Sequence, residues 1–114
     1  NKDFVDSVRT EPKYIPLQLK LKNEKLPRYN TLIDDPSEIS KLELIHKRGS
    51  IAMARSEFLG SASSQFYIAL RSLPELDGRY SVFGMVVSGL DVLNEIQEGD
   101  FVEKISFILM KNPR

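Results

Sequence analysis

Gln65 and Tyr67 are the side chains whose types and spacing best suit the binding of a ligand. They lie two positions apart in the stretch SASSQFYIAL, residues 61–70. Side chains alternate between the two faces of a strand, so an extended backbone would place both on one face. An amide beside an aromatic ring can hold a partly polar, partly apolar ligand such as a peptide, although a half-buried strand with its glutamine in water has the same pattern. The opposite, core-facing side would carry Phe66, Ile68 and Leu70.

Other kinds of catalytic chemistry have few candidates in this sequence. Without cysteine there is neither a disulfide framework nor a thiolate metal site, and one histidine is too few for a histidine-rich metal centre. That residue, His46, lies in the charged segment ELIHKR, so we expect it at the solvated surface and outside any Ser-His-Asp triad. Asp34 and Asp35 directly precede Pro36, where carboxylates form turns more often than acid–base pairs. We therefore expect no metal and no cofactor.

The length and charge of the chain limit its possible partners. The 114 residues correspond to about one domain with a modest core. The 16 Lys and Arg residues balance 16 Asp and Glu residues, so the charge gives no reason to expect nucleic acid as a partner. The longest apolar runs, such as residues 105–110, are much too short to span a membrane.

The elements that must position Gln65 and Tyr67 are predicted to be mainly β. Residues 1–14 form an N-terminal segment of mixed charge, and the strand that follows over 15–22 alternates leucines with polar residues. Frequent proline, asparagine and aspartate residues indicate a long connection over 23–48, with one helical turn near residues 37–42. Further strands are predicted at residues 50–54, 65–70, 81–87 and 102–110.

A helix is predicted over residues 89–97, before the last strand. Ser88 stands three residues before Asp91 in a capping arrangement, and Gly99 is suited to end the helix. Its apolar side would carry Leu90, Leu93 and Ile96. The predicted strands should form an antiparallel sheet that curves over its own apolar face, but they are too few for a closed barrel.

Three motifs follow one another in the second half of the chain. They are GSIAMAR at residues 49–55, SASSQFYI at 61–68 and LDGRYSVFG at 76–84, and the GLDV that opens the predicted helix comes after them. In order and spacing these motifs resemble the cyclophilin family of peptidyl-prolyl cis-trans isomerases.

Shorter segments resemble one branch of that family more narrowly. They are residues 4–6, residues 14–17 and the pair Gly99-Asp100. These segments are similar to the multidomain cyclophilins of the thylakoid lumen of plants and cyanobacteria. The resemblance implies the thylakoid lumen as the location of the protein.

The family fold implied by the resemblance is an eight-stranded antiparallel barrel capped by two helices. Residues 1–114 would correspond to the C-terminal portion of that domain, with barrel strands and the C-terminal helix over residues 49–110. The expected fold is therefore mainly β, a cyclophilin-like antiparallel barrel present in part. The family's early strands and its Phe-x-Arg pattern, which carries the catalytic arginine, have no counterpart here. The resemblance thus implies no catalytic residue in this segment and an upstream segment that would complete the barrel.

The resemblance also implies which residues would bind proline-containing peptides or protein clients. Tyr67 and Leu76 would line the proline pocket, with Met53 beneath the strand that forms its floor. Gln65 would contact the substrate through its amide. The peptide residues before the proline would be extended and would pair with main-chain groups of this protein. One further aromatic side chain would stand where many family members have histidine. These positions are Ala54, Arg55 and Ser56 for the main chain and Tyr80 for the aromatic residue.

The implied function is catalysis of rotation about Xaa-Pro bonds during protein folding. The alternatives are a non-catalytic peptide-binding or assembly-factor domain and a purely structural β-domain, because some positions depart from the family pattern. Tyr67 stands where phenylalanine is most common, Glu75 where many members have tryptophan, and FLG at residues 58–60 replaces the usual Asp-Pro-Asn turn. An exposed apolar pair in that turn would alternatively mark a contact with a partner. Arg55 is expected at the edge of the cleft and not in the role of the catalytic arginine.

Overall fold

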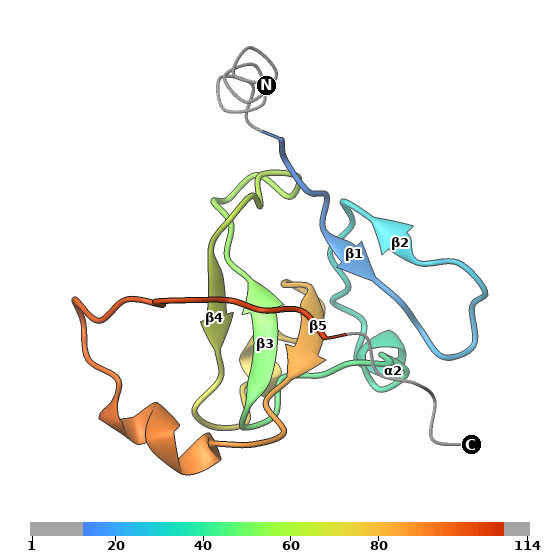
Figure 1. The fold of residues 1–114 in the computed structure, drawn as a ribbon. Helices are drawn as coiled ribbons and strands as arrows, with labels where there is room; N and C mark the ends of the chain where they lie inside the picture. The colour runs from blue at the N-terminus through green and yellow to red at the C-terminus, as the bar shows by residue number, and fades with distance from the viewer. Residues whose placement is uncertain (1–12, 109–114) are drawn as a thin grey trace.

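The computed structural model describes residues 13–108, in which short strands and helical turns are joined by long loops (Figure 1). The strands are β1 (Gln18–Leu19), β2 (Arg28–Tyr29), β3 (Ser50–Met53), β4 (Phe66–Ile68) and β5 (Val82–Met85). The helical elements are α2 (Pro36–Ile39) and the 3-10 helices η1 (Pro74–Leu76) and η2 (Leu90–Glu95). Most of the predicted segment 1–14, including the resemblance at residues 4–6, lies outside the described residues.

Two antiparallel sheets carry the fold. β3 is the central strand of the larger sheet, with β4 and β5 on either side, while β1 pairs with β2 in the smaller one. A register shift between Ile51 and Ala52 indicates a bulge against β5, and bulges bend a strand and increase its twist. Within residues 13–108 the strands do not close into a barrel, which agrees with the prediction of a mainly β, partial barrel.

The apolar core lies around β1. All three leucines of the predicted strand over 15–22 are buried, whereas Gln18 and Lys22 between and after them are exposed, as the alternation predicted. The regular strand is shorter than predicted: β1 spans Gln18–Leu19. Isolated bridges at Ile15 and Leu21 extend the pairing on either side of it. The buried cluster consists of Leu17, Leu19, Leu21, Ile33 and Leu42.

The helical turn predicted near residues 37–42 is present as α2 and begins slightly earlier than predicted, because Asp35 caps it. Its Oδ1 accepts hydrogen bonds of 2.9 Å from the N–H and from the hydroxyl of Ser37, and Pro36 is suited to the first helical position. The bond from the Ser37 N–H is the main cause that lowers the pKa of the Asp35 carboxyl. Asp34 instead pairs with Arg79 at 2.8 Å. The two aspartates are therefore turn and surface residues, as expected.

The strand predicted over 65–70 is shorter in the structure and less buried than expected. β4 ends at Ile68, and Phe66 and Leu70, which were predicted to face the core, are 45% and 53% exposed. The core forms around β1 instead, so the side of β4 that carries Phe66 remains largely uncovered within residues 13–108. β5 is likewise shorter than the predicted strand over 81–87.

The helix predicted over 89–97 is the shorter 3-10 helix η2, and its predicted caps are wrong. Ser88 makes no capping bond, because Gly89 with φ +85° is the residue that precedes the first turn. The helix ends before Ile96, so Gly99 does not terminate it. Leu93 is buried but Ile96 is exposed, and an apolar side this narrow gives little packing to stabilise further turns.

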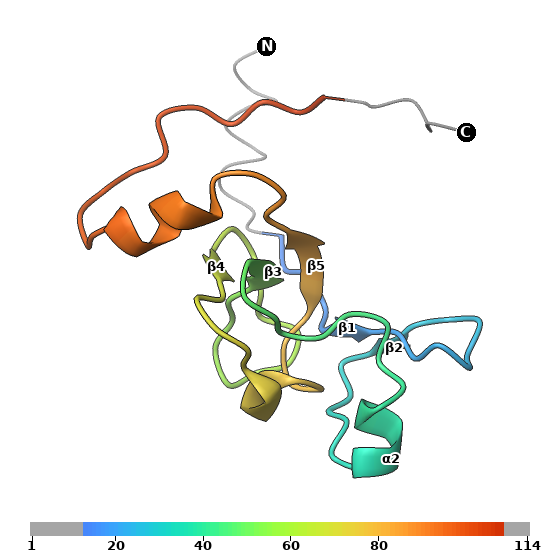
Figure 2. The same ribbon diagram turned by 90° about the horizontal axis from the view of Figure 1, so that it is seen from below.

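Residues 101–108 form no strand, contrary to the prediction of a strand over 102–110, whose last two residues lie outside the described part. A strand needs a neighbouring strand to satisfy its backbone groups. Figure 2 shows this segment running clear of both sheets after η2. Its large apolar side chains are exposed as a result, with Phe107 reaching 95%.

Candidate functional site

A cavity of about 250 Å³ lies beside the end of β3. Tyr67 projects into it from β4, which pairs with β3 so that Tyr67 lies opposite Ala52. Leu76 contributes from the end of η1, and the chain then returns along β5 on the other side of β3. All the residues that line the cavity belong to the set proposed from the sequence. They are Ala54, Arg55, Tyr67, Leu76 and Tyr80.

Gln65 and Ser56, the remaining members of that set, are exposed and do not line the cavity. The Ala54 N–H donates to the Gln65 carbonyl oxygen at 2.9 Å, which continues the β3–β4 pairing by one residue and leaves Gln65 on the Tyr67 face. Ser56 is held in a turn, where its N–H donates to Ser61 Oγ at 2.9 Å. Contact of all these residues with a ligand stays a prediction.

Arg55 and Tyr80 form one edge of the cavity. The guanidinium carbon of Arg55 lies 4.6 Å from the centre of the Tyr80 ring, a cation–π geometry. The guanidinium also donates to the carbonyl oxygens of Ser56 and Arg79, and these bonds fix its position. Tyr80 in turn meets Tyr67 edge to face, with ring centres 5.8 Å apart. Arg55 is therefore engaged with its own chain at the edge of the cavity.

His46 is 1% exposed, so the prediction of a solvated surface histidine is wrong. Asp77 Oδ1 accepts a hydrogen bond from the main-chain N–H of His46 at 2.7 Å and lies 2.8 Å from Nδ1. Nε2 lies 2.7 Å from the Tyr67 hydroxyl oxygen, and the two rings stack with their centres 5.9 Å apart. The histidine can be buried because both ring nitrogens have partners.

Sequence reasoning assigned no role to His46 or Asp77. The exposed neighbours Lys47 and Arg48 suggested a surface segment, but they point away while the histidine side chain points inward. Asp77 lies in the LDG motif, yet it is 31 residues from His46 in the chain. No local pattern links two residues so far apart, so the pair becomes visible only in the folded chain.

Burial is the main reason why the pKa of the Tyr67 hydroxyl is raised above its ordinary value. The negative charge that Tyr80 acquires when ionised raises the pKa further, while the positive charge of Arg55 opposes both effects. In the folded protein Tyr67 therefore keeps its proton at a pH where an unfolded tyrosine has lost it.

The raised pKa predicts a pH-dependent contribution of Tyr67 to stability. The contribution should be fully present below about pH 10, where an unfolded tyrosine titrates, and should be lost as the pH rises further. The measurement is urea unfolding of the wild type and of Tyr67→Phe, which has no hydroxyl to ionise. Above about pH 10 the unfolding free energy of the wild type should fall relative to that of Tyr67→Phe. A difference that stays constant across this range would contradict the raised pKa.

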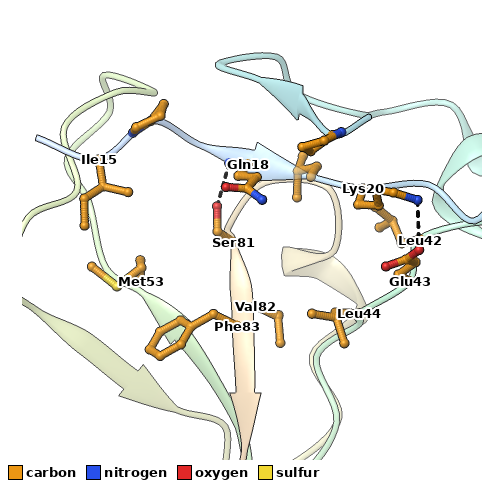
Figure 3. A pocket seen from close by; sticks show the side chains of 13 residues that line it. Ile15, Gln18, Lys20, Leu42, Glu43, Leu44, Met53, Ser81, Val82 and Phe83 are labelled. Atoms are coloured by element: carbon orange, nitrogen blue, oxygen red, sulfur yellow. Dashed lines mark hydrogen bonds and ion pairs between the residues drawn. The ribbon is translucent and has the colours of Figure 1, made fainter. Parts of the chain in front are cut away.

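A larger groove of about 530 Å³ opens on the other side of β3 (Figure 3). Figure 3 shows Met53, Val82 and Phe83 on one side of it and Ile15 and Gln18 on the other. The Gln18 N–H of β1 donates to Ser81 Oγ at 2.8 Å, and Ser81 directly precedes β5, so this bond links the two sheets. Met53 is thus on the face of β3 opposite to the Tyr67 cavity, as a residue beneath the floor strand would be. The groove is lined by apolar side chains together with polar ones such as Gln18, Lys20 and Glu43.

Two negative findings apply to the described part of the chain. Across residues 13–108 no three His, Asp or Glu side chains gather as a metal site would require. The helices of the same residues lack the length and apolar content needed to cross a membrane.

Comparisons with known proteins match most of the chain. A family model described as cyclophilin type peptidyl-prolyl cis-trans isomerase/CLD matches residues 6–110. A probable peptidyl-prolyl cis-trans isomerase of Brucella abortus is 42% identical over 80 residues, which cover 70% of this chain and 38% of the relative. A chloroplastic peptidyl-prolyl cis-trans isomerase of Arabidopsis thaliana is 32% identical over 116 residues, covering 92% of this chain and 26% of the relative. A putative thylakoid lumen peptidyl-prolyl cis-trans isomerase of Synechocystis is 35% identical over 107 residues, covering 85% and 28%.

Proposed function

Because the chain belongs to the cyclophilin-type peptidyl-prolyl cis-trans isomerase family, we propose that it forms the peptide-binding part of a domain that catalyses rotation about Xaa-Pro bonds in protein clients. The chain spans 38% of the length of the Brucella relative, so the activity is proposed for a longer domain that contains these residues. The observation that carries the proposal is the cavity beside β3, whose lining residues were all expected at the peptide site from the family resemblance.

The chemistry of this reaction suits a site that binds without a nucleophile. Rotation about a peptide bond has a barrier of about 18–20 kcal/mol, because amide resonance must be broken, and no covalent step is required. A site accelerates the rotation if it binds the twisted amide more tightly than either planar isomer. In this cavity the rings of Tyr67 and Tyr80 and the side chain of Leu76 would hold the proline ring. A hydrogen-bond donor to the proline nitrogen is expected from the upstream arginine of the family pattern.

The main chain after β3 offers a place for an extended peptide, although less of it is available than the sequence suggested. The N–H groups of Ala54 and Ser56 already donate, to the Gln65 carbonyl and to Ser61 Oγ. Among the described residues the Arg55 N–H has no such partner. Of the three main-chain positions predicted to bind the substrate, we therefore favour Arg55 as the donor to a substrate carbonyl.

The open groove is a reason to propose that an upstream segment completes the barrel. Met53, Phe83 and neighbouring residues present apolar surface to the groove, and the segment after η2 exposes further apolar side chains. Exposed apolar patches of this kind mark surfaces that pack against another element. An added strand would also pair with the free edges of the two sheets.

The location proposed is the thylakoid lumen. Its support is the name of the Synechocystis relative, which places that protein in the thylakoid lumen, together with the chloroplastic name of the Arabidopsis relative. Fractionation of the native organism with an antibody against this chain tests the location.

An isomerase assay tests the function directly. The rate of cis-to-trans conversion of a proline tetrapeptide would be compared for the 114-residue chain and for a longer chain that includes the residues encoded upstream. We expect the longer chain to exceed the uncatalysed rate, which corresponds to tens to hundreds of seconds per event. Peptide binding without acceleration would instead favour the non-catalytic assembly-factor alternative. Failure of the longer chain to bind any proline peptide would contradict the proposal.

Alanine substitutions test where the peptide binds. We expect Tyr67→Ala to weaken binding of a proline tetrapeptide about tenfold or more, corresponding to about 1.4 kcal/mol, because the ring forms a wall of the cavity. Gln65→Ala should weaken binding with little change in stability, since the side chain is exposed. Tyr29→Ala is the matched control, because that tyrosine is exposed in β2 and does not line the cavity. Unchanged affinity in both site variants would place the peptide elsewhere.

A further inference from the structure

We propose that His46 and Asp77 are positioning residues that turn the Tyr67 hydroxyl proton away from the cavity and so make this wall a hydrogen-bond acceptor. The proposal rests on the proposed function of the cavity as a peptide site. It concerns a hydroxyl that the family resemblance does not lead one to expect, since phenylalanine is more common at this position.

Asp77 determines which nitrogen of His46 carries the proton. An ionised carboxylate can only accept hydrogen bonds. Its Oδ1 already accepts from the His46 main-chain N–H at 2.7 Å, and at 2.8 Å from Nδ1 it can accept a second bond from a protonated Nδ1. In a neutral imidazole the other nitrogen is then unprotonated. In the neutral ring Nε2 of His46 is therefore an acceptor.

The acceptor at Nε2 fixes the direction of the Tyr67 hydroxyl. The Tyr67 oxygen lies 2.7 Å from Nε2, so its single proton is donated to His46. The stacked His46 ring, with an interplanar angle of 7°, and the perpendicular Tyr80 ring hold the phenol in place. Since the proton is directed at His46, the oxygen has no donor left for a group in the cavity and can only accept a hydrogen bond from it.

This arrangement has a consequence for substrate preference. A phenol that can only accept a hydrogen bond favours a peptide N–H at this wall and disfavours a carbonyl oxygen there, since two acceptors cannot satisfy each other. The cavity would thus distinguish peptides by the group they present to Tyr67. Phenylalanine at the same position could not make that distinction, because it has neither donor nor acceptor.

Nitrogen NMR of the imidazole tests the arrangement without any ligand. His46 is the single histidine of the chain, so its two ring nitrogens give one unambiguous set of signals. At neutral pH we expect a protonated Nδ1 and an unprotonated, hydrogen-bonded Nε2. Tyr67→Phe, which keeps the ring but removes the hydroxyl, should shift the Nε2 signal toward that of a free imidazole nitrogen and leave Nδ1 in place. A protonated Nε2, or an Nε2 signal that does not respond to Tyr67→Phe, would overturn the proposal.

Two substitutions at position 46 then test the effect on binding. In His46→Gln the side-chain amide reaches the place of Nε2 and can still accept a hydrogen bond from the Tyr67 hydroxyl. In His46→Asn the shorter amide reaches only the place of Nδ1, so it can donate to Asp77 but cannot accept from Tyr67. We expect His46→Gln to bind a proline tetrapeptide within about threefold of the wild type and His46→Asn to bind it about tenfold more weakly. Circular dichroism would establish that both variants are folded. Equal affinities of two folded variants would overturn the proposal.

The two measurements separate this inference from the proposed function. A wild type that shows the expected ring protonation but binds no proline peptide would contradict the peptide site, and with it the role of the hydroxyl in binding. A wild type that binds the peptide but has its proton on Nε2 would leave the peptide site intact and contradict the positioning role alone.

Discussion

Gly78→Ala is expected to destabilise the folded chain by about 2–5 kcal/mol. Gly78 has φ +83°, a left-handed conformation that costs a residue with a Cβ about 1–2 kcal/mol. An added Cβ would also collide with the carbonyl oxygen of Ile33, a backbone atom that cannot move aside like the end of a side chain. Such overpacking typically costs a further 1–3 kcal/mol, roughly. Urea unfolding monitored by circular dichroism measures the sum.

Gly89→Ala is a control for the collision. Gly89 has nearly the same backbone angle, φ +85°, but no heavy atom lies within 4 Å of the place where its Cβ would stand. Gly89→Ala should therefore lower the unfolding free energy only by the cost of the left-handed conformation, about 1–2 kcal/mol. Equal losses in the two variants would show that the contact with Ile33 contributes nothing.

The position of Gly78 connects the core to the candidate site. The Ile33 N–H donates to the Gly78 carbonyl oxygen at 3.0 Å, and Ile33 belongs to the buried cluster around β1. Asp77, the preceding residue, bonds to His46 behind the Tyr67 wall. We therefore expect folded Gly78→Ala protein to show a perturbed His46 imidazole spectrum as well as lower stability.

Leu21→Ala is expected to cost about 2–5 kcal/mol of unfolding free energy. Leu21 is 1% exposed and packs in the cluster with Leu17, Ile33 and Leu42, so truncation removes apolar contacts and leaves a cavity. In a chain with so small a core, a loss of this size is a large part of the total stability of a domain, which is about 5–15 kcal/mol. The midpoint of urea unfolding should fall markedly.

Leu26→Ala is the matched control for this truncation. Leu26 lies five positions further along the chain and is 77% exposed, so the same chemical change should alter stability by about 0.5 kcal/mol or less. If the two alanine variants unfolded at the same urea concentration, the cluster around β1 would not be the core of the protein.

The sequence predicted well those features that depend on neighbouring residues. Leucines at every second position from residue 17 identified a half-buried strand, because alternation is a property of the extended backbone itself. The helical turn near residues 37–42 was predicted approximately, because such turns depend on residues within two or three positions, and the structure shows Asp35 as its cap. The motifs over 49–84 pointed to the cyclophilin family, which the family model matches. They also supplied the residues that line the cavity.

Features that depend on distant partners could not be predicted in this way. The apolar run over 102–110 has the composition of a strand, but its described part, residues 102–108, pairs with no neighbouring backbone among the described residues and forms no strand. The two-residue strand β2 was missed inside the long connection, since only its pairing with β1 makes it a strand. Phe66 was assigned to the core by its alternation, although burial also requires an element that covers the face.

His46 shows most clearly what only the tertiary structure decided. The sequence around it is charged, and that local pattern predicted exposure. The fold brings Asp77 and Tyr67, 31 and 21 positions away, to its two ring nitrogens, and these hydrogen bonds make burial of the imidazole tolerable. The sequence by itself determined the family, the alternation of buried leucines over residues 17–21 and the five residues of the cavity wall, although Gln65 and Ser56 of the predicted set lie outside that wall. The chemical character of that wall was decided by long-range contacts, because the direction of a hydroxyl proton depends on which partner the folded chain places beside it.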